Sequence, residues 1–135
     1  LFPTMDCAVM TAAVADYTPI NVVDSKIKRD KENHVIELKP TRDIAASLGE
    51  IKNDGQYVVG FALETNDEEE NARKKIRNKK LDFIVLNSLN DEGAGFGYDT
   101  NKITIIDKNN NSWKFKLKSK TEAAKDIVNK ISEFF

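Results

Sequence analysis

The sequence predicts an α/β fold with a mainly parallel sheet that is covered on both faces and extended by an antiparallel edge hairpin. Three near-continuous apolar runs, at residues 7–14, 57–62 and 81–86, have the character of strands buried on both faces. Segments with helical spacing separate them. Two alternating runs, 102–107 and 112–117, flank the turn Lys108-Asn109-Asn110-Asn111, which indicates the hairpin.

The first apolar run ends at a carboxylate, Asp16, and then at Pro19. Pro19 lacks an N–H and restricts Thr18, so we expect Asp16 at the carboxyl end of the strand. Open α/β sheets bind their ligands at that end. Small residues in this run would let a ligand approach the backbone, although core packing is the more common reason for small residues in a buried strand.

The next elements are a short strand and a helix. Residues 18–33 are polar and irregular, 34–38 indicate a short strand, and Lys39-Pro40-Thr41 breaks it. A helix over 43–52 places Ile44, Leu48 and Ile51 on one face.

The strand at 57–62 leads to a helix that begins at Asn66 or Asp67 and ends near Lys80. Its acidic start and basic end match the helix dipole, which is the default explanation for its lysines. Lys75 and Lys79 are nevertheless four residues apart and share one face, so a nearby anion is the alternative explanation.

The strand at 81–86 ends at Asn87, and a Gly-, Asn- and Asp-rich loop follows over 88–101. This loop is not a dinucleotide fingerprint, because a strand and not a helix comes next. Ser119 and Glu122 form a capping box for the last helix. The residues of that helix expected to face the core are Ala123, Ala124, Ile127, Val128 and Ile131.

Composition limits the class of protein. The 135 residues predict a single domain over 1–135, and 21 basic against 22 acidic residues argue against nucleic-acid binding. No apolar stretch reaches the length of a membrane span, and the single cysteine, Cys7, fits a reduced, buried thiol in a cytoplasmic protein. His34 is the only histidine, so we expect neither a His-based metal site nor a catalytic triad.

Several motifs, taken together, resemble one known family. They are Ala12-Ala13-Val14-Ala15-Asp16-Tyr17, Lys26-Ile27-Lys28, Gly60-Phe61-Ala62-Leu63-Glu64-Thr65-Asn66, the helix with Lys75 and Lys79, and the Leu81-Asp82 strand that ends in Asn87. In this order and spacing the chain is similar to the C-terminal half of phosphopantothenoylcysteine synthetase, the phosphopantothenate-cysteine ligase of coenzyme A biosynthesis. The N-terminal half of that domain is absent from the sequence.

The resemblance implies a Rossmann-like three-layer sandwich with CTP as co-substrate and Mg²⁺. It implies that 4′-phosphopantothenate and cysteine are joined through an acyl-cytidylate in a cytoplasmic homodimer. FMN would be present only if a decarboxylase domain were fused upstream. The alternative is a nucleotide-binding Rossmann-like module without ligase activity.

By position, the resemblance also implies the site. Lys26 would stabilise the activated intermediate as the catalytic residue, and the segment 41–44 would meet the nucleotide at a helix N-terminus, which suits an anion. The full set of nucleotide-binding residues is Met10, Thr11, Ala12, Asp16, Lys26, Thr41, Arg42, Asp43, Ile44, Phe61, Lys75 and Lys79. Thr41-Arg42 departs from the Asn-Pro or Thr-Pro of many relatives, and no metal ligands are expected from the protein.

Overall fold

The computed structural model describes residues 1–29, 33–88, 90, 93–94 and 97–135. Its elements are η1 (Phe2–Thr4), β1 (Cys7–Met10), β2 (Tyr17–Pro19), β3 (Leu38–Pro40), α1 (Ile44–Ile51), β4 (Tyr57–Glu64), α2 (Glu68–Lys79), β5 (Phe83–Ser88), β6 (Thr100–Asn101), β7 (Ile103–Asp107), β8 (Ser112–Lys114), β9 (Lys118–Ser119) and α3 (Lys120–Ser132). Within these described ranges no helix is both long and apolar enough to cross a membrane.

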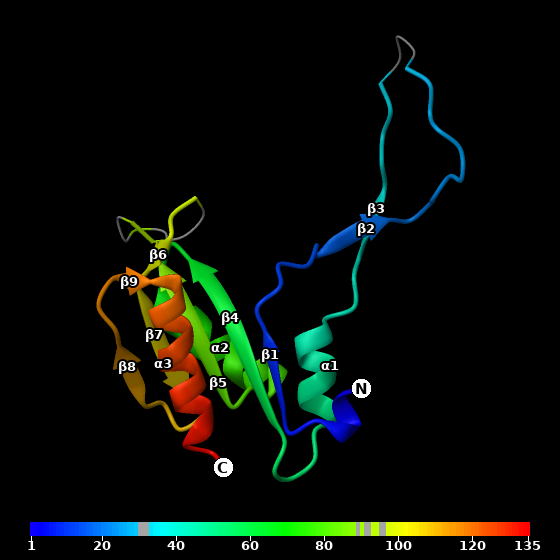
Figure 1. Ribbon diagram of the computed structural model, residues 1–135. Coiled ribbons are helices and arrows are strands. Elements are labelled where there is room, and N and C mark those ends of the chain that lie inside the picture. The colour runs from blue at the N-terminus through cyan, green and yellow to red at the C-terminus, as the bar shows by residue number, and fades with distance from the viewer. Residues whose placement is uncertain (30–32, 89, 91–92, 95–96) are drawn as a thin grey trace.

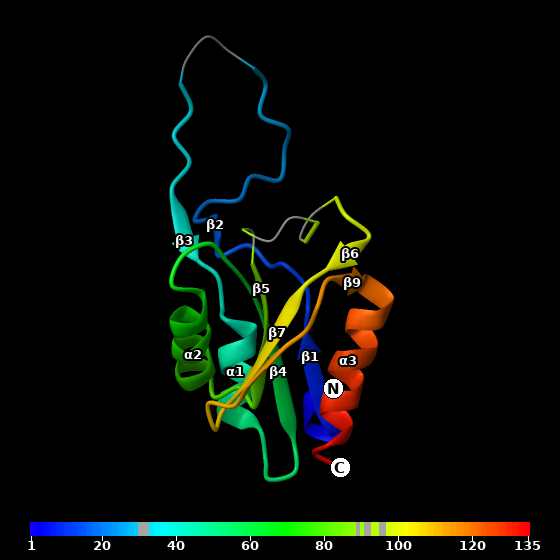
Figure 2. The same cartoon turned by 90° about the vertical axis from the view of Figure 1, so that its left-hand side faces the viewer.

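A five-stranded sheet forms the centre of the molecule, in the order β1-β4-β5-β7-β8. β1, β4 and β5 are parallel, and β7 and β8 continue the sheet in antiparallel register. α1 and α2 lie on one face of the sheet and α3 lies on the other (Figure 1, Figure 2). The predicted three-layer α/β fold with its edge hairpin is therefore confirmed.

The two faces of the sheet have separate apolar cores, because successive side chains of a strand point to opposite faces. In β4, Val58 and Ala62 belong to the core beneath α1 and α2, and Val59 belongs to the core beneath α3. In β5, Ile84 faces the first core, while Phe83 and Val85 face the second. The central strands are thus buried on both sides, as their uninterrupted apolar sequence predicts.

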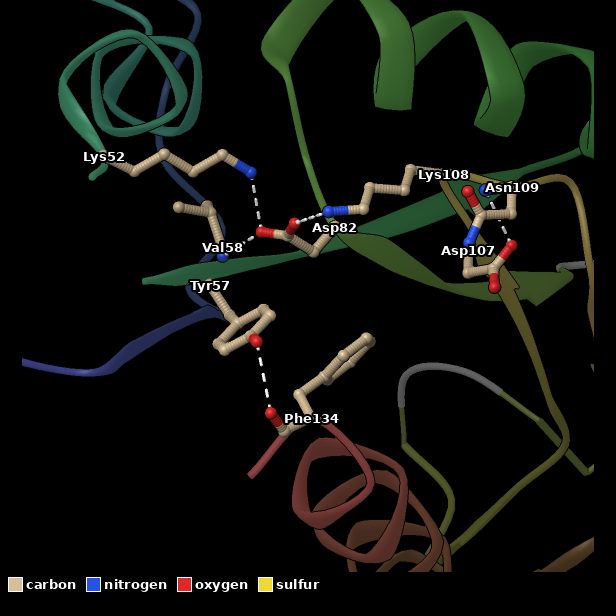
Figure 3. Close-up of polar contacts among 8 residues, drawn as sticks. All are labelled: Lys52, Tyr57, Val58, Asp82, Asp107, Lys108, Asn109 and Phe134. Atoms are coloured by element: carbon tan, nitrogen blue, oxygen red, sulfur yellow. Dashed lines mark hydrogen bonds and ion pairs between the residues drawn. The ribbon is translucent and has the colours of Figure 1, made fainter. Parts of the chain in front are cut away.

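Asp82 joins three elements at the amino ends of the strands (Figure 3). It is 2% exposed, accepts a hydrogen bond from the Val58 amide at 2.8 Å, and pairs with Lys52 at 2.7 Å and Lys108 at 2.9 Å. Burial acts against ionisation of this carboxyl, but the hydrogen bonds from Lys52, Val58 and Lys108 outweigh it and lower its pKa. Asp82 therefore stays charged and ties the end of α1 and the turn before β8 to β4.

Several predicted strands differ from the structure in their bounds, and the one predicted at 112–117 ends at Lys114. β1 ends at Met10 instead of continuing to residue 14, so Asp16 lies in the connection beyond the strand. The strand predicted at 34–38 lies instead at Leu38–Pro40, where it pairs with β2. β5 begins and ends two residues later than predicted, because Leu81 and Asp82 belong to the turn before it.

β2 and β3 form the base of a long arm, residues 17–40, that projects from the body (Figure 1). Residues 20–29 and 33–37 in the described part of the arm have no strand or helix. Large apolar side chains are exposed there, including Val22 at 80% and Val35 at 88%. The arm therefore lies outside the two cores.

α3 covers less of its face than the sequence predicts. Ala123 and Ile127 are buried and Ile131 is partly buried, as expected. Ala124 is exposed and Val128 is 58% exposed, which corrects the prediction that they face the core. The apolar stripe of this helix is wider than the sheet surface it packs on.

Candidate functional site

A cleft of about 550 Å³ lies at the carboxyl end of the parallel strands, on the side of α1 and α2. Its floor includes Met10 and Gly60, which are paired neighbours in β1 and β4. A Cβ at Gly60 would lie 2.6 Å from the Leu81 Cδ1 atom, so a larger residue there would require the Leu81 side chain to shift. The predicted ligand edge of the sheet is thus hollow on this side.

The connection between β1 and β2 is fastened to the start of α1. The Thr41 hydroxyl donates to the Ala15 carbonyl at 2.6 Å, and the Thr41 amide donates to the Asp16 carbonyl at 2.9 Å. These two bonds bring residues 12–16 beside segment 41–44, although some 26 residues separate them in the chain. Two predicted parts of the site therefore line one cleft.

Asp43 caps α1 and also contacts α2. Its side chain accepts from the Ala46 amide at 2.9 Å and pairs with Lys79 at 3.0 Å. The hydrogen bond from the Ala46 backbone N–H, assisted by Lys79, holds the pKa of this carboxyl below its ordinary value. Asp43 is therefore a fixed negative charge that positions Lys79 at the cleft.

Lys75 is held in a similar way, at 2.6 Å from Glu64 at the end of β4. Lys75 is 41% exposed and Lys79 is 32% exposed, and both line the cleft. The two lysines share one face of α2, as their spacing predicts. The sequence offered no signal for their carboxylate partners beyond the position of Glu64 at the end of a strand.

The structure brings together most of the predicted binding residues. Those that line the cleft are Met10, Ala12, Asp16, Thr41, Arg42, Asp43, Ile44, Phe61, Lys75 and Lys79. Tyr17, Pro40, Leu81 and Ile84 also line it, and the sequence analysis did not assign them.

Thr11 and Lys26 are not part of this lining. Thr11 lines a neighbouring cleft over the strand tips and the groove beside α3. Lys26 lies on the exposed arm, and the described lining of the cleft does not include it. The arm leads away from the sheet (Figure 1). Lys26 is only ten residues after Asp16 in the sequence, but this does not bring it beside Asp16 in space. The predicted catalytic placement of Lys26 is thus not seen.

The geometry of the described residues does not support a metal site. Within the described ranges, no group of three or more His, Cys, Asp or Glu side chains could together hold an ion.

The whole chain, residues 1–135, matches the model of the family described as DNA/pantothenate metabolism flavoprotein C-terminal domain. Two relatives are similar in sequence. A protein named cysteine/cysteine sulfinic acid decarboxylase, from an unknown prokaryotic organism, is 58% identical over 96% of this chain and 36% of its own length. The coenzyme A biosynthesis bifunctional protein CoaBC of Bacillus subtilis (strain 168) is 43% identical over 98% of this chain and 32% of its own length. The chain thus spans about a third of the length of these curated relatives.

Two solved structures share the fold. The C-terminal domain of a coenzyme A biosynthesis bifunctional protein CoaBC superposes with a TM-score of 0.72 at 37% identity, over 96% of this chain and 55% of that one. A Cab2 mutant in complex with phosphopantothenate-cysteine superposes with a TM-score of 0.57 at 15% identity, over 78% of this chain and 36% of that one. The second likeness concerns the fold alone.

These comparisons correct the expectation of a ligase. The matching family is described as a flavoprotein domain, and the relative with 58% identity carries the name of a decarboxylase. The comparisons therefore do not support a synthetase with 4′-phosphopantothenate, cysteine and CTP as its substrates and Mg²⁺ as its ion. The physical reason for the error is that cations and small residues at strand ends favour an anion without specifying the reaction that follows.

Proposed function

Since the chain belongs to the family of C-terminal domains of DNA/pantothenate metabolism flavoproteins, we propose that it is one domain, residues 1–135, of a decarboxylating enzyme of coenzyme A biosynthesis. In this proposal the cleft binds phosphopantothenate-cysteine, which carries a phosphate and a carboxylate. Loss of the carboxylate as CO₂, with a proton taking its place, gives the decarboxylated product. The reaction class is supported by the name of the relative with 58% identity.

The observation that carries the proposal is the pair of positioned cations on α2. Lys75 and Lys79 line one cleft, and Glu64 and Asp43 fix their side chains there. A phosphate dianion can replace or share these carboxylate contacts, because charge-assisted hydrogen bonds to phosphate are among the strongest in proteins. The other side of the cleft is apolar, with Phe61, Ile44 and Met10, which suits the aliphatic body of such a ligand.

We do not assign this cleft to FMN. The polar edge of a flavin ring needs hydrogen-bond donors, and two donors on this wall are already engaged within the protein. The Thr41 hydroxyl donates to the Ala15 carbonyl, and the Arg42 Nε atom donates to the Ser47 hydroxyl at 2.9 Å. The two lysines of the lining are assigned to the phosphate of the ligand. The proposal therefore gives this cleft no part in flavin binding.

Calorimetric titration of the protein with phosphopantothenate-cysteine tests the proposal. Lys75→Gln and Lys79→Gln should each weaken binding at least about tenfold, because a hydrogen bond to a charged group contributes about 1.5 to 3 kcal/mol. The loss should shrink as added salt screens the wild-type attraction. Lys74→Gln is the matched control, since Lys74 lies on the same helix, pairs with Glu70 at the surface, and is not among the lining residues.

Two outcomes would overturn the proposal. One is equal affinity of the wild type, Lys75→Gln and Lys79→Gln for this ligand at low salt. The other is tighter binding of a nucleoside triphosphate than of phosphopantothenate-cysteine with the same dependence on both lysines.

A further inference from the structure

A second cleft of about 510 Å³ lies over the tips of β1 and β4. It shares Met10, Ala12, Val14, Phe61 and Lys75 with the first cleft. One extended ligand can therefore lie across the strand tips and occupy both. The residues of the second cleft that the first cleft lacks are Thr11, Ala13, Ala62, Leu63, Asn87, Asn101 and Lys120.

Lys120 is the charged group that distinguishes this second cleft. It is the first residue of α3, whose start is held by the Ser119 and Glu122 capping box. A cation at this end of a helix is opposed by the helix dipole, so helix stability does not explain its charge. Among the described residues no carboxylate pairs with Lys120, and none lines the second cleft. Lys75 and Lys79, in contrast, are both paired.

Two asparagines, Asn87 and Asn101, line the same cleft as Lys120. The Asn101 side-chain nitrogen donates to the Asn87 side-chain oxygen at 3.2 Å, and the Asn101 oxygen accepts from the Lys102 amide at 3.0 Å. This arrangement orients the Asn87 amide and leaves its nitrogen without a described acceptor. A cation and an amide donor in one lining suit a carboxylate, which accepts several hydrogen bonds at once.

We propose that Lys120 binds the carboxylate of the ligand whose phosphate is held by Lys75 and Lys79. This inference rests on the proposed function. It assigns to Lys120 the recognition of the carboxylate end of the ligand, opposite the phosphate. Lys120 thereby favours the carboxylated compound over its decarboxylated counterpart, which retains the phosphate and the aliphatic body. Loss of the carboxylate removes the partner of Lys120 and weakens the hold of this domain on the product.

The test compares calorimetric affinities for phosphopantothenate-cysteine and for the same compound without the carboxylate. The wild type should bind the carboxylated compound at least about fivefold more tightly. Lys120→Gln should abolish this preference and leave the affinity for the decarboxylated compound unchanged, which also shows that the variant is folded. Lys75→Gln should weaken the binding of both compounds by a similar factor. Lys125→Gln, an exposed lysine further along α3, is the matched control and should keep the preference.

Failure of this inference is distinguishable from failure of the proposed function. If the wild type binds neither compound, the proposed function fails and this inference falls with it. If the wild type binds both compounds equally, or Lys120→Gln retains the preference, the carboxylate subsite is overturned while the phosphate site stands.

Discussion

At the scale of single residues, Asp82 has the strongest structural role among the described carboxylates. Replacing it with Asn keeps the size of the side chain and removes the charge that Lys52 and Lys108 share. We expect Asp82→Asn to lower the free energy of unfolding by about 1 to 3 kcal/mol, because both charge-assisted hydrogen bonds weaken. The lysines limit the loss, since Lys108 is 53% exposed and can turn to solvent. Urea unfolding measures the difference.

Asp54→Asn is the control for this prediction, because Asp54 is exposed in the turn before β4. The pKa of Asp82 is lowered in the folded protein, so its charge stabilises the fold above the unfolded value near pH 4. That contribution is lost as the pH falls through the lowered pKa. The difference in the free energy of unfolding between the wild type and Asp82→Asn should therefore be constant near neutral pH and decrease on acidification. A difference that grew below pH 4 would contradict this.

At the scale of helices and strands, Gly49 determines how closely α1 approaches α2. A Cβ on Gly49 would lie 1.9 Å from the Lys79 carbonyl oxygen, which is backbone and cannot move by itself. Helix propensity alone predicts that Gly49→Ala stabilises α1 by about 1 kcal/mol. We expect the opposite sign, a loss of about 1 to 3 kcal/mol, because the helices must move apart.

The same displacement would draw Asp43 away from Lys79 across the cleft, so ligand affinity should fall with stability. Thermal unfolding and calorimetric binding measure the two effects. Glu50→Ala is the neighbouring control, since Glu50 makes only a surface ion pair with Lys80. An unchanged or higher melting temperature for Gly49→Ala would show that the space between Gly49 and the Lys79 carbonyl does not limit the approach of the two helices.

Elements with strong local signals were predictable from the sequence. The helix expected at 43–52 lies at Ile44–Ile51, and the capping box of Ser119 and Glu122 is formed as predicted. Both depend on contacts within a few residues of sequence. The hairpin of β7 and β8 was found for the same reason.

Elements that depend on distant partners were predicted less well. The apolar run after Met10 pairs with no strand in the described part of the chain, so residues 11–16 form a connection across the strand tips and Val14 is 60% exposed. Pro19 and Pro40 suggested strand breaks, yet both lie in the two-stranded ladder of the arm. Prolines are tolerated there, because every strand of such a ladder is an edge strand.

In the candidate site, too, local features were predictable from the sequence and long-range contacts were not. Lys75 and Lys79 were predictable because helical spacing fixes that they share a face. The ion pairs with Glu64 and Asp43, and the fastening of Ala15 to Thr41, are long-range contacts that no local pattern encodes. Lys120 was missed because its approach to the strand tips depends on how α3 packs.

At the scale of the whole molecule, β1 is an edge strand of the central sheet. Among the described strands it pairs with β4 alone, and Val9 in its middle is 41% exposed, whereas Val85 in β5 is completely buried. We expect the amides of β1 to exchange with solvent through local opening and those of β5 only through global unfolding. Hydrogen exchange followed by mass spectrometry measures both.

A ligand in the cleft should slow exchange in β1 and the connection after it by favouring the closed form. Exchange in β8, which is remote from the cleft, serves as the internal control. Equal protection of β1 and β5 without ligand would contradict the prediction.

The register of β1 also bears on the order in which the chain folds. Cys7 pairs with Tyr57, so this ladder closes a loop of about fifty residues that includes the whole arm, whereas β7 and β8 are joined through a short turn. Loop closure costs entropy that grows with loop length, and pairings between distant residues form slowly. The ligand edge is therefore expected to be the last part of the sheet to assemble. In refolding, the fluorescence of Trp113, the single tryptophan and a residue of β8, should reach its native value before the protein becomes competent to bind.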